Sequence, residues 1–374
     1  MGENEMLNAC VRFVKKNTVL AIAMAAALIT MCIVPPDAAY AGYLDFKTLT
    51  CLFCVLAVVC ALKNVHFFTF LARKIVQLTG NARMAILALV YITFIGSMLI
   101  ANDMALLTFL PLGYYVLAAT GQMKYLAFTF IMQNIAANLG GMLTPFGNPQ
   151  NLYLYTRFSI PNGEFVSIMW PPFALAVVLI TVCCLFVRGE KLSLARDESP
   201  APPRGRTAIY LLLFALAIVI VFRAIPYWIG LIVIPAALLI LDRKALKQVD
   251  YALLFTFVCF FLFAGNMARI PAVRSFFSAA LEKSTLLMSA ASCQVISNVP
   301  TAILLSQFTD NYRELLWGVN IGGTGTLIAS LASLITFREY TRIYPGRAGY
   351  YIARFSAFNF GFLAVMLLFC QLLR

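Results

Sequence analysis

The sequence LGGMLTPFGNPQNLYLY, residues 139–155, interrupts an apolar segment with two prolines, three glycines, two asparagines and a glutamine. Inside a bilayer, each backbone group that lacks a hydrogen-bond partner costs several kcal/mol. A break of this kind is tolerated at membrane depth only where protein encloses it or where it lines a cavity. The segment therefore predicts an unwound helix beside a binding site.

The composition of the chain predicts the surroundings of this helix. Hydrophobic residues make up 62% of the 374 residues, charged residues only 11%, and long apolar runs recur from end to end. We therefore expect an all-α polytopic membrane protein with about nine full spans in the lipid bilayer. The net charge of +13 comes from Lys and Arg in the short connections between apolar runs. This is the positive-inside pattern, so no nucleic-acid partner is expected.

The N-terminal residues predict the orientation. Arg12, Lys15 and Lys16 precede an apolar run at 18–34. We interpret this run as a retained first span, with cleavage within residues 1–41 as the alternative. The N-terminus is then cytoplasmic, in the inner (plasma) membrane of the cell.

The soluble segment RGEKLSLARDESPAPPRGR divides the chain into two membrane halves. This cytoplasmic linker, 188–206, separates residues 1–187 from residues 207–374. In the first half we predict an interfacial amphipathic helix at 63–83, an inward-opening re-entrant hairpin at 84–119 and a broken helix at 125–157. In the second half we predict an outward-opening hairpin at 284–309 and a broken helix at 315–336. The two hairpins would thus be opposed.

An internal repeat supports this division. NLGGMLT at 138–144 recurs without gaps as NIGGTGT at 320–326. Upstream of each copy, a polar pair follows an apolar approach: Asn102-Asp103 in the first half and Ser297-Asn298 in the second. Two motif types in the same order, with opposed hairpins, indicate an inverted-topology repeat. In transporters this arrangement holds the substrate and ion site at the midplane.

The polar residues at the predicted hairpin tips are suited to bind ions. The amides of Asn102 and Asn298, with the exposed N–H groups of the following helix, can bind an anion. Asp103 is an intramembrane carboxylate with no Lys or Arg nearby in the sequence, which marks a proton or cation site. Capping of the next helix is its alternative role, and the two roles are compatible.

The glycine pairs of the broken helices let the backbone unwind, so that carbonyl groups can coordinate Na+. Packing of small residues is the alternative for the glycines, but it leaves Asn148 and Asn151 unexplained. The candidate substrate-binding residues are Asn102, Asp103, Thr144, Asn151, Ser297, Asn298 and Thr326. The candidate ion-binding residues are Asn102, Asp103, Gly141, Asn148, Asn298, Gly323 and Thr324. These oxygen and amide ligands suit Na+ and oxyanions, so no transition-metal site and no cofactor are expected.

At these residues the chain resembles the ion transporter superfamily of divalent-anion/sodium symporters, citrate-type carriers and arsenite permeases. TPFGNPQNLYLY is similar to the helix break of that group, and Ser297-Asn298-Val299 matches two of three residues of its Ser-Asn-Thr motif. Asn102-Asp103 departs from that motif and looks more like the Ala-Asn-Asp of arsenite permeases. The resemblance implies a homodimer, a scaffold half and a transport half in each protomer, and elevator-type movement.

We therefore interpret the chain as a secondary active permease of a small anion, a carboxylate or an inorganic oxyanion, driven by Na+ or H+. Arsenite efflux or sodium/proton antiport, with Asp103 as the proton-carrying group, is the alternative. A channel or a non-transporting membrane scaffold is a third reading. No Walker-type nucleotide motif and no catalytic constellation within the spans is present in the sequence, which argues against a pump and against an enzyme.

Overall fold

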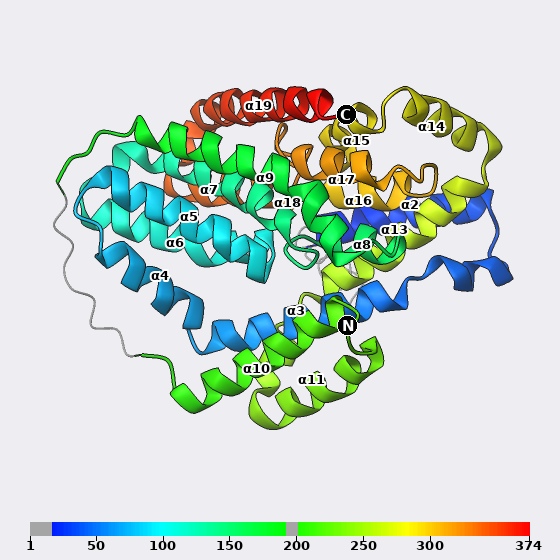
Figure 1. The fold of residues 1–374 in the computed structure, drawn as a ribbon, viewed down its shortest axis with the longest axis horizontal. Coiled ribbons are helices and arrows are strands. Elements are labelled where there is room, and N and C mark those ends of the chain that lie inside the picture. Colours follow the sequence, from blue (N-terminus) through cyan, green and yellow to red (C-terminus); the bar gives the residue numbers. More distant parts are fainter. Residues whose placement is uncertain (1–16, 192–200) are drawn as a thin grey trace, which may run out of the picture.

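The computed structural model describes residues 17–191 and 201–374, which form helices and no β-strand (Figure 1). Before the linker these are α2 Thr18–Ile33, α3 Phe46–Asn64, α4 Phe67–Gln77, α5 Ala82–Ile100, α6 Asn102–Ala119, α7 Leu126–Gly140, α8 Pro149–Arg157 and α9 Asn162–Leu185. After it come α10 Arg204–Val221, α11 Tyr227–Leu241, α12 Arg243–Lys247, α13 Tyr251–Arg269, α14 Pro271–Lys283, α15 Thr285–Ile296, α16 Asn298–Leu305, α17 Tyr312–Ile321, α18 Leu331–Ile343 and α19 Ala348–Leu372. Short 3-10 turns join several of them.

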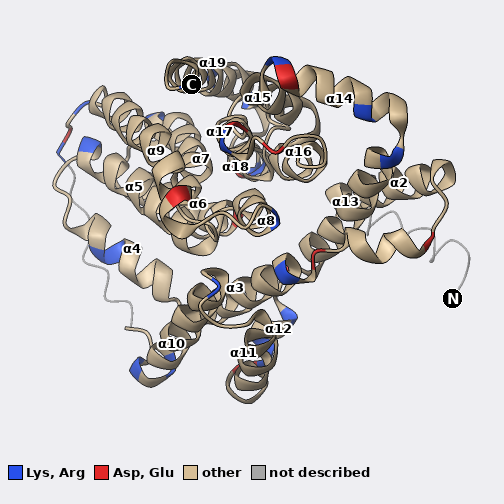
Figure 2. Ribbon diagram, turned by 45° about the vertical axis from the view of Figure 1, so that its right-hand side comes forward, with Lys and Arg blue, Asp and Glu red and all other residues tan. Residues whose placement is uncertain are grey.

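Seven helices in the described part of the chain are long and apolar enough to cross a membrane, and three shorter apolar helices accompany them. Charged residues lie mostly at helix ends and connections (Figure 2). The prediction of an all-α polytopic membrane protein is confirmed. Polar caps fix where several helices begin: the side chains of Asp45, Asn81 and Ser284 accept hydrogen bonds from backbone N–H groups of the next turn, at 2.9, 2.9 and 3.2 Å.

In each of two helix pairs, the chain reverses direction at a single residue. Ala101 joins α5 to α6 with φ 65° and ψ 153°, and Ser297 joins α15 to α16 with φ 72° and ψ 162°. Non-glycine residues rarely adopt positive φ. The same uncommon conformation therefore occurs at the tips of two hairpins far apart in the sequence.

The open end of the first hairpin lies beside the C-terminal end of α9. Ala82 N donates to Glu190 O at 2.8 Å, and Lys124, just after α6, forms an ion pair with the Glu190 side chain at 2.5 Å. The open end of the second hairpin lies beside the end of α19, where Leu286 N donates to Glu314 Oε2 at 3.0 Å and Arg374 pairs with Glu314 Oε1 at 2.7 Å.

Helices α9 and α19 each run from the open end of one hairpin to the open end of the other. Helix α9 ends beside the first hairpin and begins near the start of α17, where Glu164 accepts a hydrogen bond from the Tyr312 hydroxyl at 2.7 Å. At the start of α19, Arg347 and Tyr350 line a cavity together with Lys124. Since α19 is 25 residues, or about 37 Å, long, the two hairpins open toward opposite ends of the molecule.

The order of elements also occurs twice. A long helix, a short amphipathic helix, a hairpin, a broken helix and a second long helix follow each other from α3 to α9 and again from α13 to α19. The halves interlock, because α18 packs on α6 and α7 while α8 packs on α16 and α17. Helices α10 and α11 pack on α3, and α2 packs on α13 (Figures 1 and 2). Helices α3 and α13 in turn contact the interlocked group at α8 and α16.

The structure differs from the prediction at two boundaries and in one additional helix. The amphipathic helix is shorter than 63–83: it is α4, separated from α3 by His66 at φ 58° and from α5 by the Asn81 cap. Helix α10 begins at Arg204, inside the predicted linker, with Pro203 as its N-cap residue. Helix α14 was not predicted. The predictions for residues 1–16 and the middle of the linker, 192–200, lie outside the described residues.

Candidate functional site

The first helix break separates α7 from α8. Helix α7 ends at Gly140, a 3-10 turn follows at Gly141–Leu143, and the chain is extended at Thr144 and again at Asn148, before Pro149 starts α8. The side chain of Asn151 compensates for the lost helical bonds: its Nδ2 donates to the carbonyls of Gly141, Met142 and Thr144 at 3.3, 3.2 and 3.4 Å. The unwound backbone is thus held by an amide from the first turn of α8.

The second break, between α17 and α18, is held by a side chain of the neighbouring hairpin. Gln294 in α15 donates through Nε2 to the carbonyls of Gly322 and Thr324, at 2.9 and 3.2 Å. Its Oε1 accepts from Thr326 N at 2.8 Å. Because a backbone N–H can only donate, this contact fixes which end of the amide faces the carbonyls.

The predicted threonines make the same contact in both halves. Thr144 Oγ1 donates to Met98 O at 2.8 Å, and Thr326 Oγ1 donates to Gln294 O at 3.1 Å. Each accepting carbonyl lies four residues before the asparagine of a hairpin tip. Both hydroxyls therefore hold a broken helix against a hairpin, which is a structural use of the two predicted substrate-binding residues.

The two tip asparagines have equivalent environments. Oδ1 of Asn102 and of Asn298 each accepts from the next backbone N–H, in both cases at 2.9 Å. Asn102 Nδ2 donates to Asn138 Oδ1 at 3.2 Å. A Cβ on Gly323 would lie 3.2 Å from Asn298 Nδ2 and 3.7 Å from Asn138 Oδ1. The two tips therefore meet around Asn138 and Gly323, both of which belong to the repeated motif.

Asn320, the counterpart of Asn138, links the broken helices. Its Oδ1 accepts from Asn148 Nδ2 and Gln150 Nε2, at 3.3 and 3.4 Å, and its Nδ2 donates to Asn151 Oδ1 at 2.6 Å. Asn148 also donates to Asn138 O at 3.3 Å. We call Asn102, Asn138, Asn148, Gln150, Asn151, Asn298 and Asn320 the amide cluster; all are at most 4% exposed.

The amide cluster has unused hydrogen-bonding capacity. Among the described residues, Asn138 Nδ2, Asn148 Oδ1 and Gln150 Oε1 are buried without a partner. A buried polar group without a partner costs about 1–3 kcal/mol. Nearly all such groups in native proteins are paired with protein, water or ligand, so the cluster has one further donor and two further acceptors for a ligand.

The other predicted site residues lie around the cluster. Ser297 Oγ donates to Ala329 O at 3.3 Å, and Thr324 Oγ1 donates to Ile321 O at 2.6 Å. Gly141 contacts Asn148 so closely that a Cβ there would overlap Asn148 Oδ1. Asp103 is partly buried in the first turn of α6, and its Oδ1 lacks a partner in the described part of the chain. It is the one carboxylate next to the tips among residues 17–191 and 201–374.

Several cations of the described chain make their contacts away from the cluster. Arg223 donates to Tyr155 O at the end of α8 and stacks on the Tyr155 ring, 4.0 Å from the ring centroid. Outside the spans, the hydrogen bonds from Arg269 hold the pKa of Asp37 below its usual value, and those from Lys124 and Gln122 lower the pKa of Glu190. None of these cations has a recorded contact with the amide cluster.

Sequence reasoning missed three residues of the site. Asn138 and Asn320 open the two copies of the repeated motif, so their matching positions were a signal that could have identified them. Gln294 is a lone amide in the apolar helix α15, and its role depends on contacts 28 to 32 residues away in the chain. Only the folded structure shows those contacts.

The citrate transporter family matches residues 9–312 of the chain. An uncharacterized transporter of Methanocaldococcus jannaschii is 31% identical over 79% of this chain and 81% of its own length. The chain belongs to the citrate transporter family. The inner membrane protein YbiR of Escherichia coli is 30% identical to this family member over 73% of the chain and 74% of its own length. A silicon efflux transporter of rice, Oryza sativa, is 26% identical over 42% of the chain and 33% of its own length.

Membership in the citrate transporter family decides the general activity. This family and the relatives named as transporters move solutes across membranes, so the chain is a multi-pass membrane transporter and not an enzyme. The amide cluster lies where both hairpin tips and both helix breaks meet. It is the candidate site at which this citrate transporter family member holds its solute.

Proposed function

We propose that the protein is a secondary active transporter of a small anion, a carboxylate or an inorganic oxyanion, held between Asn102 and Asn298. The observation that carries the proposal is the buried amide cluster formed by both halves of the chain, in which Asn138 Nδ2 is a buried donor without a partner among the described residues. Amide N–H groups and the helix starts at the tips attract an anion without a full positive charge. Membership in the citrate transporter family agrees with a carboxylate substrate.

The proposed mechanism is elevator-type alternating access. Hairpins that open to opposite ends, each packed on the broken helix of the other half, fit an inverted-topology repeat with its site at the midplane. The interlocked group of hairpins, broken helices, α9 and α19 would move as the transport part. Helices α2, α3, α10, α11 and α13 would form the scaffold and the homodimer contact. As in the sequence-based prediction, the N-terminus would be cytoplasmic in the inner membrane.

The contacts at the helix breaks favour H+ over Na+ as the coupling ion. Sodium sites at such breaks use unwound backbone carbonyls. Here Asn151 Nδ2 donates to three carbonyls of the first break, and Gln294 Nε2 donates to two carbonyls of the second. A Na+ ion would have to displace both amides. Asp103, with an unpartnered carboxylate oxygen next to the tip, is the group placed to carry a proton.

Uptake into proteoliposomes tests the proposal. We expect Asn102→Ala and Asn298→Ala each to abolish uptake of a transported anion, while Ser167→Ala, an exposed change on α9, transports normally. Expression and elution volume should match the parent. Uptake should follow a pH gradient and not a Na+ gradient. Undiminished uptake in both asparagine variants would remove these residues from the site.

A second candidate function is efflux of a small uncharged hydroxyl compound, such as arsenious or silicic acid. The amide cluster contains neutral groups only, and no cation contacts it in the described structure. A neutral solute would use the donors and acceptors equally. The partial similarity to a silicon efflux transporter agrees with this candidate. In this case Asp103→Asn should remove the pH dependence of efflux, and an unchanged pH profile would leave Asp103 as a helix cap.

A further inference from the structure

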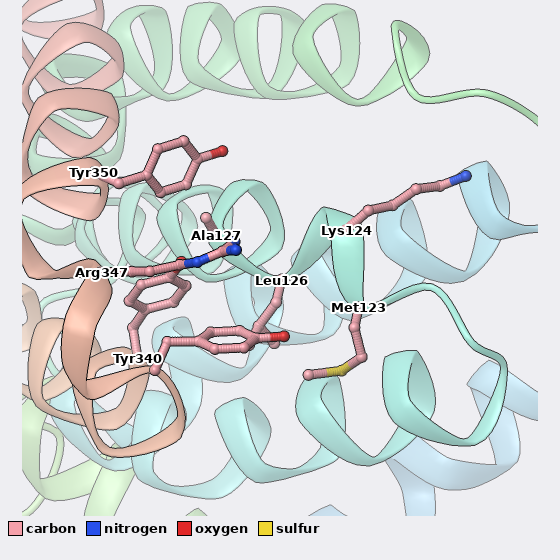
Figure 3. A pocket seen from close by; sticks show the side chains of 8 residues that line it. Met123, Lys124, Leu126, Ala127, Tyr340, Arg347 and Tyr350 are labelled. Atoms are coloured by element: carbon pink, nitrogen blue, oxygen red, sulfur yellow. The ribbon is translucent and has the colours of Figure 1, made fainter.

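A cavity of about 220 Å³ lies between the two halves, away from the amide cluster. Its walls come from the start of α7 and from the α18–α19 junction: Met123, Lys124, Leu126, Ala127, Tyr340, Tyr344, Arg347 and Tyr350 (Figure 3). It is smaller than the roughly 300–1,000 Å³ of typical small-molecule pockets. The cavity is thus suited to a compact group instead of a large organic ligand.

The chemistry of the cavity is cationic and aromatic. Arg347 has no acidic partner in the described structure, and its guanidinium lies 5.5 Å from the centroid of the Tyr344 ring. The hydroxyls of Tyr340, Tyr344 and Tyr350 have no hydrogen-bond partner among the described residues. Lys124 lines the rim and is held by Glu190. A free guanidinium beside three free hydroxyls is a donor set for a phosphate.

The place of the cavity indicates where the phosphate comes from. Arg347 lies at the start of the candidate span Pro345–Leu372, and a span end lies at the level of the lipid headgroups. Arg338, Arg342 and Arg354 add basic charge to the same segment, with only Glu339 as an acid among them, paired with Arg342 at 2.6 Å. Basic clusters next to a span attract anionic lipids of the cytoplasmic leaflet.

We propose that this cavity binds the phosphate of an anionic phospholipid headgroup, with Arg347 as the charged donor and the tyrosine hydroxyls around it. The bound headgroup joins α7 of the first half to the end of α18 in the second half. Both helices reach the amide cluster at their other ends, near Asn138 and Ser330, which are bonded at 2.8 Å. Lipid occupancy therefore stabilises the arrangement of the two broken helices.

Thermal unfolding of the delipidated full chain in detergent tests the proposal without a transport assay. We expect phosphatidylglycerol to raise the unfolding midpoint more than phosphatidylcholine does. Loss of a charge-assisted hydrogen bond should make Arg347→Ala require about tenfold more phosphatidylglycerol for half of the effect. Arg347→Lys should retain part of the effect, and the exposed Arg274→Ala on α14 should behave like the parent.

Three outcomes would overturn the proposal. Equal shifts with both lipids would show that the cavity does not select an anionic phospholipid. Equal phosphatidylglycerol dependence in the parent and Arg347→Ala would show that Arg347 does not bind the headgroup phosphate. If inorganic phosphate alone reproduces the shift and Arg347→Ala removes it, the site belongs to a soluble oxyanion and not to a lipid.

Discussion

Substitution of Asn320 by alanine tests the link between the two broken helices. The parent side chain forms four hydrogen bonds, to Asn148, Gln150, Asn151 and Leu316 O. Asn148 Nδ2 retains its bond to Asn138 O. Two other atoms lose their only partner: Gln150 Nε2 and Asn151 Oδ1. The substitution therefore leaves two buried amide atoms without a hydrogen-bond partner.

The expected loss of stability follows from these two atoms. Each buried unpaired group costs about 1–3 kcal/mol, so Asn320→Ala should lower the free energy of unfolding by about 2–6 kcal/mol. For a chain of 374 residues that corresponds to an unfolding midpoint lower by about 3–8 °C. Ser167→Ala, which removes an exposed hydroxyl bonded to Glu164 O at 2.8 Å, should shift the midpoint far less.

Differential scanning fluorimetry in detergent measures both midpoints, and the proteoliposome assay measures transport by the same preparations. We expect Asn320→Ala to lose transport as well, because the hydrogen bonds that join α17 to the start of α8 are then absent. If Asn320→Ala unfolds at the parent midpoint and transports at the parent rate, the amide cluster does not join the halves as described.

Two further predictions concern the first helix break and an ion pair at the end of a candidate span. Gly141→Ala should lower transport and stability, because the new Cβ overlaps Asn148 Oδ1, whereas Gly163→Ala, with no atom within 4 Å, should be neutral in the same assays. Arg269 and Asp37 form an ion pair at 2.7 Å, which lowers the pKa of Asp37 in the folded protein. The ion pair therefore stabilises the fold at pH values above the unfolded pKa of Asp37, about 3.9. This stabilisation is lost as the pH falls from that value through the lower pKa of the folded protein. In Asp37→Asn, the unfolding midpoint should therefore fall less steeply as the pH is lowered. If the midpoint of the variant falls as steeply as that of the parent, this ion pair does not contribute to the acid sensitivity of the fold.

Much of the architecture could be predicted because its signals are local. The break at Asn148-Pro149 and the matched motifs at 138–144 and 320–326 identified the broken helices. Helix α14 was not predicted, since its apolar residues are interrupted by Arg274, Ser275 and Ser278 and form no long run.

The site was predicted less completely. Asn102, Asn298, Asn148 and Asn151 were found because packing does not explain a polar residue in an apolar segment. The partners of these residues come from across the molecule: Asn102 meets Asn138, and Asn148 meets Asn320. Such pairings are set by how the halves interlock, and a single sequence contains no direct signal for that.

Ligand binding to purified protein tests the central claim most directly. The parent and the Asn102→Ala/Asn298→Ala double variant are screened by thermal shift with citrate, succinate, sulfate, phosphate, arsenite and silicic acid, at several pH values and with or without Na+. We predict that at least one of these compounds raises the unfolding midpoint of the parent, without a requirement for Na+, and leaves that of the double variant unchanged. A compound that stabilises both proteins equally would contradict a substrate site between the two hairpin tips.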